Sequence, residues 1–177
     1  MALNEAHVIL RDGTPALIRR LVGEDAALYP DFLGEVTRAD LRLRFFASLR
    51  EVSPALLDRL IHYDPDRAMA FICVEEKSGK MLGVVRLHDD ASGDSAEFAI
   101  LVRSGLKGHG VGWLLMQHMI EFARRKHLKT VHGEVLAENI TMLRMCSELG
   151  FHVSDDLRDP GVRTVTLPVQ AIDKADL

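Results

Sequence analysis

Three short apolar runs joined by polar turns constrain the fold of this chain most. The runs span residues 69–75, 81–88 and 96–102, and each has the length of a β-strand. The first turn contains Gly79 and the second contains Gly93. Parallel neighbours would need a crossover of a dozen or more residues, and these connections are too short for one. The sequence therefore predicts a three-strand antiparallel meander.

The clearest helical pattern follows the meander. Apolar residues recur at helical spacing across residues 110–127, and basic residues fill the last turn. We expect a strand at 130–136 and then a helix capped by Asn139 and ended by Gly150. A last strand is expected at 163–169.

The segment before the meander is mainly helical. Residues 8–21 read as two extended pieces around an Asp-Gly turn. A helix is expected over 23–36 and a second over 38–49, capped by Thr37. Ser53 is followed by proline, which predicts the start of a third helix.

This order of elements predicts an α+β fold. A strand, helices, a meander, a helix, a strand, a helix and a strand give a mixed, mostly antiparallel sheet, and not a doubly wound parallel one. No internal repeat, low-complexity tract or Pro/Gly/Ser linker divides the chain. We therefore expect residues 1–177 to form a single domain.

Composition excludes several classes of protein. The chain has 177 residues, 47% hydrophobic and 27% charged, which suits an ordinary globular domain. The net charge of −4 disfavours a general nucleic-acid binder. No apolar run approaches the roughly 20 residues of a membrane span, and no secretory signal is evident. We expect a cytoplasmic protein with two reduced cysteines, no membrane partner and, given its scattered histidines, no metal.

A glycine-rich loop, KGHGVG at residues 107–112, carries the most chemical information. It follows a predicted strand and opens a predicted helix, so its amides can bind an anion. It does not match a Walker A loop, because it lacks the Gly-Lys-Ser/Thr of that motif. It does not match a dinucleotide fingerprint either, because the third glycine of G-x-G-x-x-G is missing. The alternative is a loop whose glycines only allow close packing.

The chain resembles the GNAT superfamily of acyl-CoA-dependent N-acetyltransferases. The resemblance rests on AEFAILV, then KGHGVG and its helix, then TVHGEVLAENITMLRMCSELGF. The superfamily's pyrophosphate loop, Q/R-x-x-G-x-G/A, begins here with Lys107. Segments such as RFFASLREVSPALLDRLIHYDPDRAMAF look like the acetyltransferase domain of Pat-type bacterial protein lysine acetyltransferases, with coverage from about Arg11 to Phe151.

The resemblance implies a twisted sheet with a splayed central strand and flanking helices. Acetyl-CoA would be a co-substrate whose pantetheine arm meets backbone groups at the splay. Asn139 would contact the cofactor or fix the adjacent loop, although it can equally be a plain helix cap. The implied pantetheine contacts are Ile100, Leu101 and Val102. The implied pyrophosphate residues are Lys107, Gly108, His109, Gly110, Val111 and Gly112.

Glu97 is the candidate general base. A lysine amine has a pKa of about 10.4, so only about 0.1% is neutral near pH 7.5, and attack requires proton removal. Glu97 is the only acid within the apolar strand 96–102, so we expect it to be desolvated. Pat-type enzymes carry their general base at the matching place. The alternative is a strand-end carboxylate paired with Arg86 or another surface cation.

The general acid of the superfamily is missing. Many members carry Tyr seven residues after the motif asparagine, where this chain has Cys146. Tyr29 and Tyr63, the only tyrosines, lie far upstream. The resemblance places Cys146 near the cofactor sulfur, but its apolar neighbours favour a buried packing thiol. Ser147 is a second candidate acid, and a ping-pong route through Cys146 is disfavoured because nothing evident lowers its pKa.

These features predict an acetyl-CoA-dependent N-acetyltransferase. The resemblance favours acetylation of protein lysines, with acyl-CoA synthetases as candidate substrates, by direct attack in a ternary complex. The alternative acceptor is a small amine, such as a polyamine, amino acid or antibiotic. A third interpretation is a non-catalytic acyl-CoA-binding sensor, which would bind the cofactor without turnover.

Overall fold

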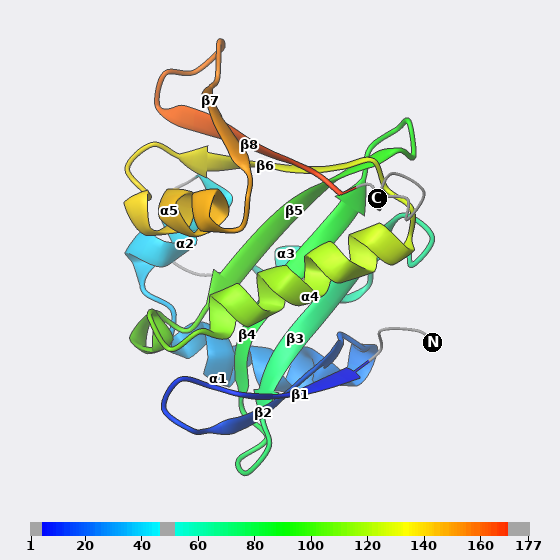
Figure 1. The fold of residues 1–177 in the computed structure, drawn as a ribbon. Coiled ribbons are helices and arrows are strands. Elements are labelled where there is room, and N and C mark those ends of the chain that lie inside the picture. The colour runs from blue at the N-terminus through cyan, green and yellow to red at the C-terminus, as the bar shows by residue number, and fades with distance from the viewer. Residues whose placement is uncertain (1–4, 47–51, 170–177) are drawn as a thin grey trace.

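The computed structural model describes residues 5–46 and 52–169, and in this part of the chain eight strands form one sheet (Figure 1). The strands are β1 (Glu5–Ile9), β2 (Pro15–Arg20), β3 (Ala68–Glu75), β4 (Met81–Asp89), β5 (Ser95–Val102), β6 (Thr130–Leu136), β7 (His152–Asp155) and β8 (Val162–Pro168). Their order across the sheet is β1-β2-β3-β4-β5-β6-β8-β7. The predicted mixed, mostly antiparallel α+β fold is confirmed.

The sheet opens between β5 and β6. All other neighbours are antiparallel, but these two strands are parallel. Only three residue pairs join them, from Ser95 with Thr130 to Glu97 with His132. Beyond Glu97 the two strands diverge, which leaves the backbone of β5 without a strand partner on that side. This divergence confirms the splayed strand and positions the site described below.

Helices cover both faces of the sheet. They are η1 (Gly23–Leu28), α1 (Tyr29–Gly34), α2 (Arg38–Phe45), α3 (Pro54–Ile61), η2 (Ser104–Leu106), α4 (Val111–Arg125) and α5 (Ile140–Glu148), the two η elements being 3-10 helices. α4 crosses one face of β3, β4 and β5, while α1 and α2 lie behind the sheet (Figure 1). Each face has its own apolar core, so successive strand residues are buried on opposite sides.

Three predicted helix starts are confirmed. Thr37, Ser53 and Asn139 each accept a hydrogen bond from the backbone N–H three residues further on, at 3.2, 3.2 and 3.3 Å. Such caps satisfy an amide that has no partner within the helix. The caps therefore fix where α2, α3 and α5 begin.

Two of the expected helices differ from the structure. The helix predicted over 23–36 is split into η1 and α1, because Pro30 has no N–H to continue the preceding turn. The helix predicted over 38–49 ends at Phe45, since Phe46 adopts a left-handed φ of 57°. Residues 47–49 of that prediction lie outside the described residues.

One strand was not predicted. β7 has four residues, all exposed, and pairs only with β8 at the edge of the sheet. With both faces exposed, it carries no alternation of apolar and polar residues that a sequence pattern could reveal. In the described part of the chain, no helix has the length and hydropathy needed to cross a membrane.

Candidate active site

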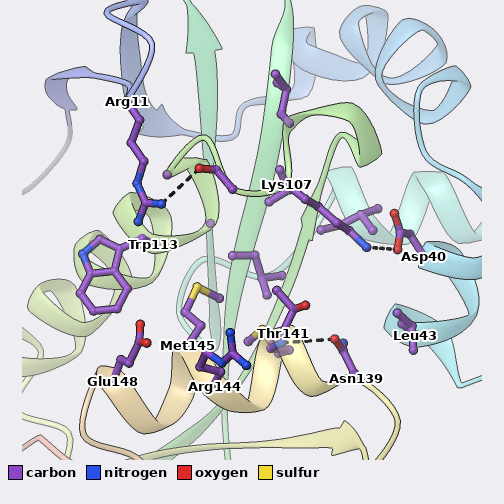
Figure 2. A pocket seen from close by; sticks show the side chains of 18 residues that line it. Arg11, Asp40, Leu43, Lys107, Trp113, Asn139, Thr141, Arg144, Met145 and Glu148 are labelled. Atoms are coloured by element: carbon purple, nitrogen blue, oxygen red, sulfur yellow. Dashed lines mark hydrogen bonds and ion pairs between the residues drawn. The ribbon is translucent and has the colours of Figure 1, made fainter.

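Two clefts adjoin where β5 and β6 diverge. The first has a volume of about 270 Å³ and lies between β5, the glycine loop and α5 (Figure 2). The second, of about 260 Å³, lies between β5, β6 and the end of α2. The two clefts share the lining residues Leu43, Ile100, Asn139 and Met142. A molecule held in the first cleft can therefore meet a second molecule in the other.

The glycine loop has the geometry of an anion site. Gly108 and Gly110 have φ values of 86° and 92°, a left-handed conformation that other residues adopt only under strain. This conformation turns the chain sharply from η2 into α4. The first amides of α4 have no acceptors within the helix, and the helix dipole adds partial positive charge there. The loop can therefore bind a phosphate group at the mouth of the first cleft.

Lys107 forms an ion pair on the side of the loop that faces α2. Its Nζ donates to Asp40 Oδ1, and Ser104 Oγ donates to the other carboxylate oxygen (Figure 2). Burial opposes ionisation of Asp40, but the hydrogen bonds from Lys107 and Ser104 outweigh it and lower the pKa of this carboxyl. The charge of Lys107 is therefore already partnered by Asp40.

The turn between β1 and β2 supports the loop from the other side. Arg11 N donates to the His109 carbonyl at 3.2 Å, and Arg11 Nη1 donates to the Gly108 carbonyl at 3.2 Å (Figure 2). His109 also lies 3.6 Å from an oxygen of Asp12. A segment about 100 residues away in the sequence thus holds the loop in place.

Eight of the eleven residues predicted to bind the cofactor line the first cleft. They are Ile100, Leu101, Val102, Lys107, Gly108, Gly110, Gly112 and Asn139. His109, Val111 and Cys146 are not among its lining residues. Val111 and Cys146 are 1% and 0% exposed and belong to the core beside α4. Their side chains cannot reach a ligand, so only the backbone of Val111 could serve the loop.

Sequence reasoning missed several residues of this cleft. They are Arg11, Asp40, Leu43, Leu106, Trp113, Thr141, Arg144 and Glu148. Spacing on α5 could have indicated that Thr141, Arg144 and Glu148 share a helix face, since they lie three and four residues apart. No sequence signal connects Arg11 with the glycine loop.

Glu97 lines the second cleft, and its surroundings differ from the prediction. Its side chain is exposed, so the expected desolvation is wrong. Phe98 points to the opposite face of the sheet, because side chains alternate along a strand. The alternative, an ion pair between Glu97 and Arg86, is not present among the described residues, and Arg86 Nη2 donates instead to Tyr29 Oη at 3.0 Å.

The second cleft contains charges of both signs. Glu97 and Glu134 contribute carboxylates, and Arg44 contributes a guanidinium. Burial and the neighbouring Arg86 lower the pKa of Arg44 to about 10, while the negative charge of Glu97 opposes this shift. Phe45 supplies an aromatic wall and lies under Arg44, 4.5 Å from its guanidinium carbon. Glu134 is paired with Arg158 at 3.3 Å, so Glu97 is the carboxylate of this cleft that forms no ion pair in the described part of the chain.

No tyrosine lines either cleft among the described residues. Tyr29 is 1% exposed, and burial raises the pKa of its hydroxyl. Tyr63 Oη donates to the Leu21 carbonyl at 3.1 Å. Burial also raises the pKa of the Cys146 thiol to about 12, which makes this thiol a poor acid and a poor nucleophile.

The carboxylates of the acidic turn between β4 and β5 are partnered by basic side chains. Asp89 pairs with Lys126 at 2.5 Å, Asp90 with His132 at 2.7 Å, and Asp94 with Lys129 at 2.7 Å. These pairs fasten the turn to the end of α4 and the start of β6. The turn therefore has a structural role, and none of its three aspartates lines either cleft.

Comparisons with known proteins agree with this geometry. The family model for the acetyltransferase (GNAT) family matches residues 35–151. The chain is 32% identical over 144 residues to acetyltransferase PA5475 of Pseudomonas aeruginosa, covering 80% of this chain and 77% of that protein. The GNAT domain of S. lividans PAT is similar in structure, with a TM-score of 0.85, 27% identity and coverage of 93% of this chain and 96% of that one.

A more distant structure shows the fold alone. It is RimL, a ribosomal L7/L12 alpha-N-protein acetyltransferase solved in complex with coenzyme A. Its TM-score is 0.71 at 11% identity, and the match covers 86% of this chain and 93% of that one.

Proposed function

The chain belongs to the acetyltransferase (GNAT) family, and we propose that it acetylates the Nε amine of lysine side chains in proteins. Acetyl-CoA-dependent acetyl transfer follows from the family. The observation that carries the finer proposal is the second cleft, which adjoins the cofactor cleft and contains Glu97 and Glu134. The similarity to the GNAT domain of S. lividans PAT also supports it.

The first cleft would hold acetyl-CoA. The diphosphate would lie on the amides of the glycine loop and on the start of α4. The pantetheine arm would follow β5 at residues 100–102, where β6 has diverged and backbone groups have no strand partner. Such groups can pair with the amides of the arm, as an added strand would. The thioester then lies near the junction of the two clefts.

Glu97 would remove the proton from the attacking amine. The amine nitrogen attacks the thioester carbonyl, the C–S bond breaks, and CoA leaves as a thiolate. A backbone N–H at the splay would stabilise the oxyanion that forms. The exposed carboxylate of Glu97 can accept the proton directly or through water. Glu97 is the only carboxylate that β5 brings into the second cleft.

The departing thiolate would be protonated by solvent. A thiol with a pKa of about 8.5 is a tolerable leaving group and needs no dedicated acid. Cys146 is fully buried with a pKa of about 12, so a covalent acyl-cysteine route is not part of the proposal. In direct transfer within a ternary complex, the acetyl group passes from CoA to the amine, Glu97 takes the proton, and no further catalytic residue is needed.

A lysine acceptor suits the second cleft. Its ammonium group would be attracted by Glu97, and its methylene chain can lie against Phe45. The cleft has a volume of about 260 Å³, which suits a single extended side chain, so the rest of the substrate would stay outside. Acyl-CoA synthetases are the proposed protein substrates. Loss of the charge on an active-site lysine would inactivate their adenylate chemistry.

The test compares acceptors in one assay. The enzyme and acetyl-CoA are incubated with a purified acyl-CoA synthetase, and acetyl-lysine is located by mass spectrometry. The matched control is the same synthetase with its active-site lysine replaced by arginine. Polyamines, free amino acids and aminoglycosides are assayed in parallel by release of free CoA thiol. Acetylation of the one lysine supports the proposal.

Two results would contradict it. Rapid CoA release with a small amine, and none with the synthetase, would assign a small-molecule acceptor. Tight CoA binding without turnover on any amine would indicate a sensor of acyl-CoA.

A further inference from the structure

Arg11 lies beside the glycine loop, and its charge is unpaired in the described structure. Its one side-chain hydrogen bond goes to the Gly108 carbonyl, which is neutral, and it forms no ion pair within residues 5–46 and 52–169. Lys107, in contrast, is paired with Asp40. Arg11 is exposed and lines the first cleft, while Lys107 points to the α2 side (Figure 2). The free positive charge at this loop therefore comes from the β1–β2 turn.

The end of the first cleft that is lined by Trp113 is suited to a nucleotide. Trp113 lies at this end, with Arg11 above it and Glu148 below it in the view of Figure 2. Arg144 lines the same cleft, one helical turn before Glu148. An indole can stack on a base, and a guanidinium can bind a phosphate. This end lies away from β5, where the pantetheine arm is proposed to run.

We infer that Arg11 binds the 3′-phosphate on the adenosine half of coenzyme A, with Trp113 beside the base. The inference rests on the proposed use of the first cleft by this cofactor. The loop amides would face the diphosphate, so the partner that suits Arg11 is a second phosphate farther along the nucleotide. A phosphate monoester carries about −1.5 to −2 charge near neutral pH, more than either phosphate of a diphosphate bridge. Arg11 uses one N–H for Gly108 and retains others for this group.

Arg11 would thus supply the guanidinium that the loop itself lacks. The superfamily loop can begin with arginine, whereas this chain has Lys107 there, turned toward Asp40. Arg11 also donates a hydrogen bond to the Gly108 carbonyl. A contact between Arg11 and the 3′-phosphate would therefore couple the conformation of the glycine loop to nucleotide binding.

The test compares coenzyme A with dephospho-CoA, which lacks only the 3′-phosphate. Binding of each to the full chain is measured by calorimetry for the wild type, Arg11→Gln and Arg11→Lys. Arg20→Gln is the matched control, since Arg20 is an exposed arginine at the other end of β2. The wild type is expected to prefer CoA about tenfold, as for one charge-assisted contact. In Arg11→Gln the ratio of the Kd for dephospho-CoA to the Kd for CoA should fall to about one, and Arg11→Lys should keep part of the preference for CoA.

The outcomes are distinguishable. If Arg11→Gln weakens both ligands equally, Arg11 only supports the loop, and the inference is overturned. It is also overturned if the ratio stays near tenfold in Arg11→Gln. Retained dephospho-CoA binding shows that the variant is folded. If the wild type binds neither ligand, the cofactor site itself is wrong, which is a failure of the proposed function.

Discussion

Glu97 and His132 form the last residue pair that joins β5 to β6 before the two strands diverge. Their side chains lie on the same face of the sheet, because paired residues of neighbouring strands point the same way. His132 Nε2 lies 2.7 Å from Asp90 Oδ2, and Asp90 also accepts a hydrogen bond from Ser95 at 2.6 Å. Glu97 thus lies at the vertex of the opening, next to a network that fixes the ends of both strands.

Replacement of Glu97 by glutamine tests its proposed role as the base. We expect kcat to fall by about 100-fold or more, with little change in CoA affinity, because the amide cannot accept the proton. The remaining rate should increase steadily with pH, since hydroxide or water then removes the proton. Steady-state kinetics over pH 6–10 measure both effects.

Glu134→Gln is the matched control for that experiment. Glu134 lines the same cleft from β6, but it is paired with Arg158 at 3.3 Å and does not lie at the vertex. We expect a higher KM for the acceptor and a nearly unchanged kcat. Equal losses of kcat in Glu97→Gln and Glu134→Gln would contradict the role of Glu97 as the general base.

Cys146 is expected to be dispensable for chemistry. Its thiol is fully buried and its pKa is raised to about 12 by burial, so it stays protonated at pH 8. Cys146→Ala should keep kcat within about twofold. Native protein should resist iodoacetamide at Cys146 and react only after unfolding. Mass spectrometry of the enzyme with acetyl-CoA should find no acetyl-cysteine, and its detection would contradict direct transfer.

Gly110→Ala should weaken the cofactor site through the backbone. Gly110 has a φ of 92°, and an added Cβ would lie 3.4 Å from the Arg11 side chain. A left-handed alanine costs about 1 kcal/mol, and relief of that strain distorts the loop. We expect a several-fold loss of CoA affinity by calorimetry. Gly105→Ala is the matched control, because no atom lies within 4 Å of its added Cβ, and it should bind CoA normally.

Asp40→Asn should reduce stability in a pH-dependent way. Burial disfavours the Asp40 carboxylate, yet the hydrogen bonds from Lys107 and Ser104 prevail and lower its pKa below the ordinary 3.8. Its contribution is therefore complete above about pH 4 and is lost as the pH falls through the lowered value. We expect a loss of about 1 to 2 kcal/mol at pH 7 and at pH 5. Urea unfolding at pH 7, 5 and 3.5 should show the difference shrinking only at the lowest pH.

The meander, α4 and the helix caps could be predicted from the sequence because their causes are local. Turn glycines such as Gly79 and Gly93 lie at the expected turns, with φ values of 71° and 73°. The apolar period of α4 and the cap at Asn139 depend on neighbours within a few residues. The glycine loop was located in the same way, as a short pattern between a strand and a helix.

The environment of Glu97 could not be predicted from its neighbours in the sequence. Ala96 and Phe98 point to the opposite face, so an apolar flank says nothing about the face that Glu97 occupies. The divergence of β6 after His132 then leaves its carboxylate exposed in the second cleft.

The sequence by itself determined most of the strands, the main helices and the loop that can bind a phosphate, because hydrogen bonding and apolar periodicity act over a few residues. Only the tertiary structure decided which charges meet at that loop. Arg11 approaches Gly108 across 97 residues and Asp40 approaches Lys107 across 67, and packing of the sheet and α2 brings them together. Such contacts depend on distances in space, which spacing along the chain does not encode.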